Sequence, residues 1–343
     1  MPLRQRAWVH AVGVNNCHSL AWRDGVEIAR DFPLAELDQW LARPDVLVWL
    51  DLGDPDPSVL AELAEELQFD PLAVEDAVAP MERPKATRHA GHTFLTCYAT
   101  SVSPAEQGGV ILGLGRVSAF ILPRALITVR SGDPVDFTPI VQRWNEDGLL
   151  THGVAALVHG MLDEIVDGHF ATITTLDDEI DALEDLLFDT RRKAAEVQQR
   201  VFGLRKALVQ LRRVVLPMRE VVTAVMRFRD DRSTELSREL DGNFNDPYDH
   251  VIRAAEWTES LRDMVSSIFE TNLSLQDARL NEIMKKLAGW AAIIAVPPAI
   301  TGWFGQNIPY PGFGDPLGLA MSAITILAGS VGLYLVFRKF DWI

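Results

Sequence analysis

The pattern of apolar and polar positions changes three times along the 343 residues of this chain. Over residues 1–150, short runs of β-branched and aromatic residues at 46–50, 93–100 and 125–130 are bounded by Gly, Pro and Asp, which predicts strands. Between them, Pro57 to Gln68 has apolar residues three and four apart, which predicts a helix. We therefore expect a mixed α/β domain, a sheet covered by helices.

From residue 151 to 240 the pattern is helical only. Apolar residues recur at steps of three or four and predict one long amphipathic helix up to Asp189. Its other face is acidic and holds no Lys or Arg, so it is either a solvated face or a reservoir that concentrates cations. A basic return helix from Arg191 to about Arg229 is expected to pack antiparallel to it, giving an acidic helical hairpin.

A second long helix is expected after a turn at Asp241–Asn245. Asp246 is predicted to be its N-cap, with Pro247 at the first helical position. The helix forms a stalk over 246–286 and, with no break after Tyr248, continues into an apolar segment, roughly 80 Å in all. A helix this long and this polar needs partners around it, which indicates a parallel homo-oligomer.

Two apolar segments close the chain, at 287–304 and 317–337. As helices they measure about 27 Å and about 31 Å, enough to cross a hydrocarbon core of about 30 Å. We expect both to be transmembrane helices. The pair Pro297-Pro298 in the first would break a soluble helix, and indicates a protein-lined or wet environment.

Basic residues flank these spans on one side only. Lys285 and Lys286 precede the first span, Arg338 and Lys339 follow the second, and the loop 305–316 has no Lys or Arg. The positive-inside rule then places both termini, including the basic tail 338–343, in the cytoplasm.

Composition excludes several classes of function. The net charge of −16 argues against nucleic acid as a partner, because phosphate binding needs a basic face. Cys17 and Cys97 are too few for a disulfide framework, and the N-terminus lacks the pattern of a signal peptide. The sequence has no Gly-rich phosphate loop, His-Glu-x-x-His or Cys-x-x-Cys, so we expect no enzyme activity and no cofactor.

Glu270, Asp277, Asn281 and Met284 follow one another at steps of seven, four and three along one face of the predicted stalk. In a parallel ring each position becomes a ring of side chains, and carboxylate and amide oxygens suit Mg²⁺ or its hydration shell. Met284 and Leu287 would form an apolar constriction that gates by dewetting. The alternative is a solvated helix face with one buried Met.

Gly305-Gln306-Asn307 follows the first span at its outer end. Gly permits close backbone approach, and Asn offers a carbonyl oxygen without full charge. A ring of such oxygens can hold a hydrated ion weakly enough to release it.

Several segments resemble the CorA family of magnesium transporters, and the resemblance covers nearly the whole chain. Gly305-Gln306-Asn307, after a proline-containing span, resembles the family's Gly-Met-Asn signature. The segment PLAVEDA at 71–77, followed by RPK at 83–85, is similar to its cytoplasmic motif. DPYDH at 246–250, LRD at 261–263 and RLNEIMK at 279–285 are similar to its stalk helix.

The resemblance implies an α+β cytoplasmic domain, a long stalk helix and two transmembrane helices, assembled as a CorA-like funnel-shaped homopentamer of the cell inner membrane. The first membrane helix lines the pore for Mg²⁺, and Co²⁺, Ni²⁺ and Zn²⁺ are further candidate ions. Family pore positions correspond to Asn307, Asn281, Met284 and Leu287, with an acidic ring at Glu270. A regulatory Mg²⁺ is expected between two acids of one subunit and one of the next: Glu75, Asp76 and Asp246.

Two departures leave alternatives open. Gln306 replaces the Met of the signature, and residues 308–313 lack the family's usual Met-Pro-Glu. Related ZntB zinc transporters also vary at the middle position, so a ZntB-like zinc transporter is one alternative. The lack of Cys and His along the pore disfavours direct Zn²⁺ ligation. The second alternative belongs to another class of function: a membrane-anchored regulatory protein that conducts no ions.

Overall fold

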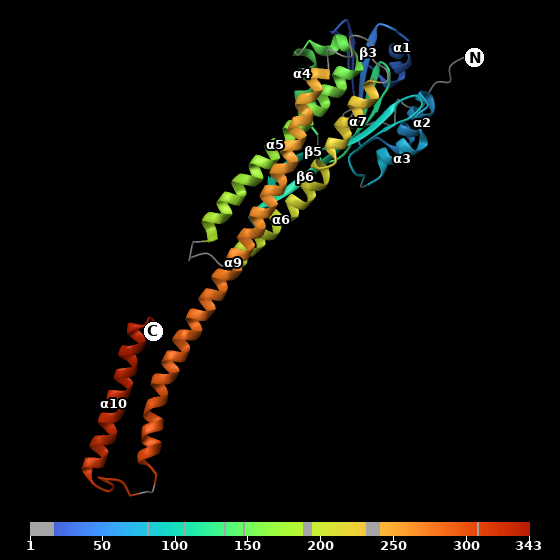
Figure 1. The fold of residues 1–343 in the computed structure, drawn as a ribbon. Coiled ribbons are helices and arrows are strands. Elements are labelled where there is room, and N and C mark those ends of the chain that lie inside the picture. The colour runs from blue at the N-terminus through green and yellow to red at the C-terminus, as the bar shows by residue number, and fades with distance from the viewer. Residues whose placement is uncertain are drawn as a thin grey trace. The chain divides into compact units, whose positions relative to one another are not determined.

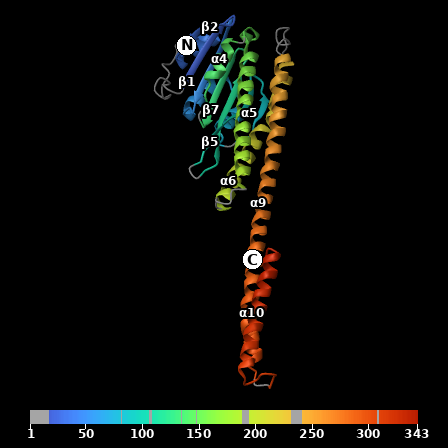
Figure 2. The ribbon, with the colours of Figure 1, turned by 90° about the vertical axis from the view of Figure 1, so that its left-hand side faces the viewer.

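A computed structural model describes residues 17–80, 82–105, 108–133, 135–146, 148–187, 194–230, 241–306 and 309–343. The chain forms two compact units, Met1–Ser266 and Ser267–Ile343. The first is a sheet covered by helices, and the second is a pair of long helices (Figures 1 and 2). The mixed α/β part and the two apolar helices therefore have the fold class predicted from the sequence.

In the described part of the chain, seven strands form one sheet in the order β2-β1-β3-β7-β6-β5-β4. Their bounds are β1 (Cys17–Arg23), β2 (Val26–Arg30), β3 (Val46–Gly53), β4 (Lys85–Arg88), β5 (Thr93–Pro104), β6 (Val110–Ile121) and β7 (Ala125–Gly132). The strands predicted at 46–50, 93–100 and 125–130 are β3, β5 and β7, so those predictions are confirmed. The central pair β3 and β7 is parallel. Every residue of β3 is buried, as expected of a strand covered on both faces.

Helices cover both faces of the sheet. One face carries η2 (Leu34–Glu36), α1 (Leu37–Leu41), α2 (Pro57–Leu67) and α3 (Pro71–Val78); the other carries α4 (Thr138–Glu146), η3 (Leu149–His152), α5 (Val154–Leu187), α7 (Met218–Asp230) and the start of α9 (Asp241–Phe304). Alternate residues of β3 divide between the two cores: Val48 and Leu50 face α2 and α3, and Leu47 and Trp49 face α4 and α5. Figure 1 shows α3 and α5 on opposite sides of β5 and β6.

The acidic helix predicted up to Asp189 is α5, Val154–Leu187, and Asp189 lies outside the described residues. The return helix is two helices, α6 (Ala194–Val215) and α7, so the prediction of one unbroken helix was wrong. Pro217 separates them, because it has no backbone N–H and disfavours helical geometry in the residue before it.

The helix α9 begins at Asp241. The turn predicted over Asp241–Asn245 was therefore wrong, and so was the assignment of Asp246 as N-cap. Pro247 lies inside the helix, where it removes the hydrogen bond that the carbonyl oxygen of Asn243 would otherwise accept.

Tertiary packing replaces that hydrogen bond. His159 of α5 is buried, and its Nε2 lies 3.1 Å from the carbonyl oxygen of Asn243. Phe244 is fully buried and packs edge-on against the His159 ring, with ring centroids 5.1 Å apart. These contacts hold the chain helical upstream of the proline, where local sequence favours a cap.

Two helices of the described residues are long and apolar enough to cross a membrane, the end of α9 and α10 (Pro316–Lys339). Gly329 lets them approach, because a Cβ added there would lie 3.1 Å from Cγ1 of Val296. The helix α9 continues through Pro297-Pro298, and the Thr301 hydroxyl donates to both proline carbonyl oxygens, at 2.9 and 3.2 Å.

One histidine of the first unit is almost completely buried. His169 of α5 is 1% exposed, and its Nε2 donates to the carbonyl oxygen of Tyr98 at 2.8 Å. The other ring nitrogen, Nδ1, is buried and has no hydrogen-bond partner among the residues that the structure describes. Burial lowers the pKa of His169 to about 4, because the charged form would bury an N–H group with no acceptor.

We expect His169 to lower the stability of the first unit as pH falls from about 6.5 to about 4. The unfolded side chain takes up a proton near pH 6.5, whereas the folded one stays neutral down to about pH 4. In this window the unfolded state binds more protons, so stability is lost as pH falls, by up to about 3 kcal/mol. Unfolding midpoints of the chain in detergent, followed by tryptophan fluorescence, should fall less steeply with pH in His169→Leu. The exposed control His18→Gln should show the same change of unfolding midpoint with pH as the parent. If the midpoint of His169→Leu changes with pH as much as that of the parent, His169 does not have this role.

Candidate ion pathway and divalent-cation sites

The side chains predicted to line a pore lie in the part of α9 that belongs to the second unit. Glu270, Asp277 and Asn281 are all exposed. Met284 and Leu287 are 61% and 62% exposed, although both are apolar. Over a rise of about 26 Å the line changes from carboxylate to amide to apolar side chains. A single chain leaves this line uncovered, which is typical of a surface that other subunits complete.

The charges beside this line are arranged unevenly. Glu282 and Lys286 form an ion pair at 2.8 Å one helical turn apart, and the hydrogen bond from Lys286 lowers the pKa of Glu282. Among the described residues neither Glu270 nor Asp277 pairs with a base. The two carboxylates on the line therefore have no basic partner among the described residues, whereas Glu282 is paired with Lys286.

At the far end of α9, Gly305 and Gln306 form the turn that follows the helix, and Asn307 lies outside the described residues. The Gly305 N–H donates to the carbonyl oxygen of Thr301 at 2.8 Å, and a Cβ at Gly305 would lie 3.0 Å from that oxygen. Glycine is therefore the residue that fits this tight approach. The geometry is compatible with Gly305 in the predicted signature and leaves the role of Asn307 a prediction.

The two predicted sensor acids near the N-terminal end of the chain lie on α3. Glu75 is exposed, whereas Asp76 is partly buried. Lys85 pairs with Asp76 at 2.8 Å and with Glu82 at 3.2 Å. Within one chain Asp76 is thus already neutralised by a lysine of β4, and any cation that binds there has to compete with that lysine.

The third sensor acid, Asp246, has a side chain that is 70% exposed, with Oδ1 3.6 Å from Nε2 of His250. It lies at the start of α9, on the face of the sheet that α5 covers, whereas α3 packs on the opposite face. The fold therefore does not bring Glu75, Asp76 and Asp246 together within one chain. Their predicted meeting requires two subunits.

A further cluster of ionisable side chains was missed by the sequence analysis. Asp163 and Asp167 of α5 and His250 of α9 have ligand atoms within 4.8 Å of one another. Arg143 of α4 pairs with Asp163 and, at 3.2 Å, with Asp167. Burial raises the pKa of Asp163, and the charge of Arg143 opposes this rise. The possible ligands come from two helices, α5 and α9, and Arg143 from a third, so no spacing along α5 could indicate the cluster.

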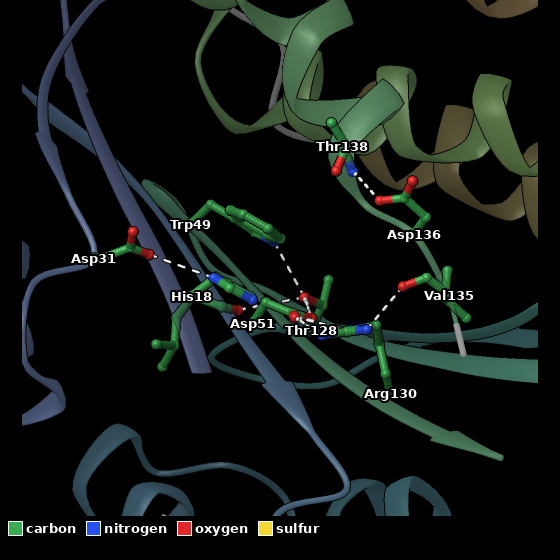
Figure 3. A network of polar contacts seen from close by, with 10 residues as sticks. His18, Asp31, Trp49, Asp51, Thr128, Arg130, Val135, Asp136 and Thr138 are labelled. Carbon is green, nitrogen blue, oxygen red and sulfur yellow. Dashed lines mark hydrogen bonds and ion pairs between the residues drawn. The ribbon is translucent and has the colours of Figure 1, made fainter. Parts of the chain in front are cut away.

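A cavity of about 560 Å³ lies in the first unit, between the sheet and α4. Figure 3 shows the polar network beside it: Arg130 binds the Asp51 carboxylate at 2.6 Å and the carbonyl oxygen of Val135 at 2.8 Å. The Trp49 indole donates to the Thr128 hydroxyl at 3.1 Å, and that hydroxyl donates to Asp51 at 2.7 Å. Because these groups satisfy one another, we attribute the network to the pairing of β3 with β7.

Comparison with curated proteins and solved structures gives relatives over most of the chain. The putative metal ion transporter YfjQ of Bacillus subtilis is 26% identical over 286 residues, covering 83% of this chain and 85% of its own. The cobalt/magnesium transport protein CorA of Thermotoga maritima is 27% identical over 330 residues, covering 93% of this chain and 90% of its own. The complete structure of the CorA magnesium transporter of Methanocaldococcus jannaschii matches with a TM-score of 0.73 at 24% identity, covering 95% of this chain and 98% of that one.

The likeness to the solved structure concerns the fold: a mixed α/β part followed by a long helix and a C-terminal apolar helix. The match of the family model extends over both compact units. That model, described as CorA-like Mg²⁺ transporter protein, covers residues 44–339, which include α3, the exposed line on α9 and both apolar helices. This chain therefore belongs to the family of CorA-like Mg²⁺ transporter proteins.

Proposed function

We propose that this chain forms a homopentameric membrane channel for Mg²⁺, with Co²⁺ and Ni²⁺ as further ions. The observation that carries the proposal is the exposed line on α9, in which carboxylate and amide side chains lead without a helix break to the apolar pair Met284 and Leu287. Family membership and the cobalt/magnesium transporter among the relatives support the choice of ion.

Each class of side chain on the line has a distinct physical role in a ring of subunits. Rings of Glu270 and Asp277 raise the local concentration of cations, and a ring of Asn281 offers neutral oxygens to the waters that Mg²⁺ keeps. The apolar rings of Met284 and Leu287 exclude water when narrow, so they stop a hydrated ion. At the other end Asn307 would receive the ion.

The orientation follows from the basic residues. Lys285 and Lys286 lie at one end of the spans together with Arg338 and Lys339, and residues 305–316 carry no base. The positive-inside rule places the first group, and so both termini, in the cytoplasm. Gly305, Gln306 and Asn307 then face outward, and the apolar gate lies at the cytoplasmic end.

The family's zinc transporters are the alternative ion choice. From Ser267 to Phe304 the chain has no Cys and no His, so the line offers neither the thiolate sulfur nor the imidazole nitrogen that Zn²⁺ prefers. We therefore assign Mg²⁺ as the transported ion.

The deciding experiment compares ²⁸Mg²⁺ and ⁶⁵Zn²⁺ uptake by proteoliposomes, with and without a pH gradient. We expect Mg²⁺ uptake that needs no pH gradient and is lost in Asn307→Ala, because the lost side-chain oxygen binds the ion. The variant should keep its oligomeric mass in detergent. Normal Mg²⁺ uptake by Asn307→Ala would contradict the role of this ring, and no Mg²⁺ uptake by the parent would contradict the proposed function.

A second prediction concerns the gate. Met284→Asp should raise basal Mg²⁺ uptake, because a ring of carboxylates hydrates a constriction that an apolar ring keeps dry. The matched control Met284→Leu keeps the ring apolar and should show the parent's basal uptake. If Met284→Asp leaks no more than the parent, this face of α9 does not line the pore.

The third prediction concerns inhibition by internal Mg²⁺. With Asp246 exposed and inside α9, Asp246→Asn removes one charge per subunit without disturbing a helix cap. Since the bridging cation would lose a ligand, the variant should stay open at internal Mg²⁺ concentrations that close the parent. Asp249→Asn is the matched control, because Asp249 is 66% exposed on the same helix and pairs locally with Arg253. Equal inhibition of Asp246→Asn and the parent would remove Asp246 from the sensor.

A further inference from the structure

The last residues of the chain turn back toward α9. After α10 ends at Lys339, Asp341 takes a positive φ of 53°, the left-handed conformation that commonly ends helices. The Trp342 N–H donates to the carbonyl oxygen of Phe337 at 2.9 Å, and the Asp341 N–H donates to that of Arg338 at 3.4 Å. This hydrogen-bonded turn reverses the chain direction.

The reversed tail packs on α9 within the second unit. The Trp342 ring stacks on Phe337, with centroids 5.5 Å apart and planes at 11°, and Nζ of Lys285 lies 5.8 Å from the centre of the Trp342 ring. A Cβ placed on Gly289 would lie 3.1 Å from Cγ1 and 3.4 Å from Cδ1 of Ile343. Residues 281–288 of α9 are all exposed, whereas Gly289 is buried. Ile343 therefore fills the gap that this glycine leaves.

The contact between Ile343 and Gly289 lies close to Met284 along α9 but on another side of the helix. Gly289 follows Met284 by five residues, a rotation of about 140° around the helix axis, so the two lie on opposite sides of α9. Lys285 directly follows Met284 along the chain. The tail therefore packs on the side of α9 that faces away from Met284 and Leu287, which we call its back, at the level of the same helical turns.

We propose that Trp342 and Ile343 form a C-terminal latch that holds the pore shut. The inference rests on the proposed function, because Met284 and Leu287 are gate residues only if the chain conducts. To widen the constriction, α9 has to move away from the pore axis, toward its back. Ile343 occupies the space behind Gly289, and Trp342 binds α9 to α10 at the same level. Contacts made only in the shut arrangement favour that arrangement.

A reversible crosslink tests both the docking and its consequence. In a chain with Cys17→Ala and Cys97→Ala, the pair Gly289→Cys and Ile343→Cys should form a disulfide within one subunit, seen as a monomer with its thiols protected. Mg²⁺ uptake by oxidised proteoliposomes should fall about tenfold and recover on reduction, because the latch can no longer release. Each single-cysteine variant is the control and should not respond to oxidation.

Deletion of Trp342 and Ile343 should have the opposite effect and raise basal Mg²⁺ uptake about tenfold, with the oligomeric mass unchanged. Asp341→Asn is its control, because Asn also tolerates the left-handed conformation and keeps the turn.

The other possible results distinguish the docking of the tail, the latch and the proposed function. No crosslink, or one that joins two subunits, would overturn the docking of the tail on its own α9. A crosslink that leaves uptake unchanged, with a deletion that also leaves it unchanged, would overturn the latch. If the cysteine-free parent takes up no Mg²⁺, the proposed function fails and the gating role with it, while the crosslink still reports the docking by itself.

Discussion

The continuous backbone hydrogen bonding of α9 is the constraint on which the rest of this structure depends. A chain that enters a bilayer has to satisfy every backbone N–H and C=O group internally, and a helix does so within one segment. Because α9 runs from Asp241 to Phe304 as one helix, the polar line and the apolar pair keep a fixed rotational relation to the apolar span. A break in the helix anywhere between Glu270 and Leu287 would let these side chains rotate relative to the apolar span.

Charge is the second organising property, and the fold neutralises much of it locally. Arg143 is shared among acids of α5, Lys85 binds Asp76, and Arg212 of α6 pairs with Glu259 of α9. The count of 48 Asp and Glu residues therefore overstates the number of carboxylates that a divalent cation meets without a base beside them. A regulatory cation gains most where carboxylates of two subunits meet without a base between them, and least where a lysine already neutralises them.

Small residues and turns set the contacts of the second unit. Gly329 admits Val296, and Gly289 admits Ile343. In lipid, helix association relies on such close packing rather than on a hydrophobic driving force, so these glycines have a direct energetic role. The left-handed Asp341 adds a third element, since it decides where the last two residues lie.

Local pattern determined much of the architecture. The runs that became β3, β5 and β7, the helical period of α5 and the two apolar spans followed from side-chain spacing and composition, because each depends on which face of one element is apolar. The resemblance to the family, carried by short segments spread over the chain, indicated the candidate pore and sensor residues. The exposure of Glu270, Asp277, Asn281, Met284 and Leu287 along one helix agrees with that placement, and their roles remain proposals.

Other features depend on contacts between residues far apart in the sequence. From local sequence, Pro247 predicts the start of a helix. The structure differs because His159 of α5 contacts the carbonyl oxygen of Asn243 that the proline leaves free, and the helix begins earlier. At Pro217 the described residues provide no such partner for a continuous helix, and the local rule held: the chain broke into α6 and α7. The cluster of Asp163, Asp167 and His250 and the seat of Ile343 on Gly289 likewise join segments that no local period relates. The sequence by itself determined elements such as β3, α5 and the two apolar spans, whose periodicity is local. Only the tertiary structure decided where α9 begins and which charges are satisfied, because those partners come from other elements.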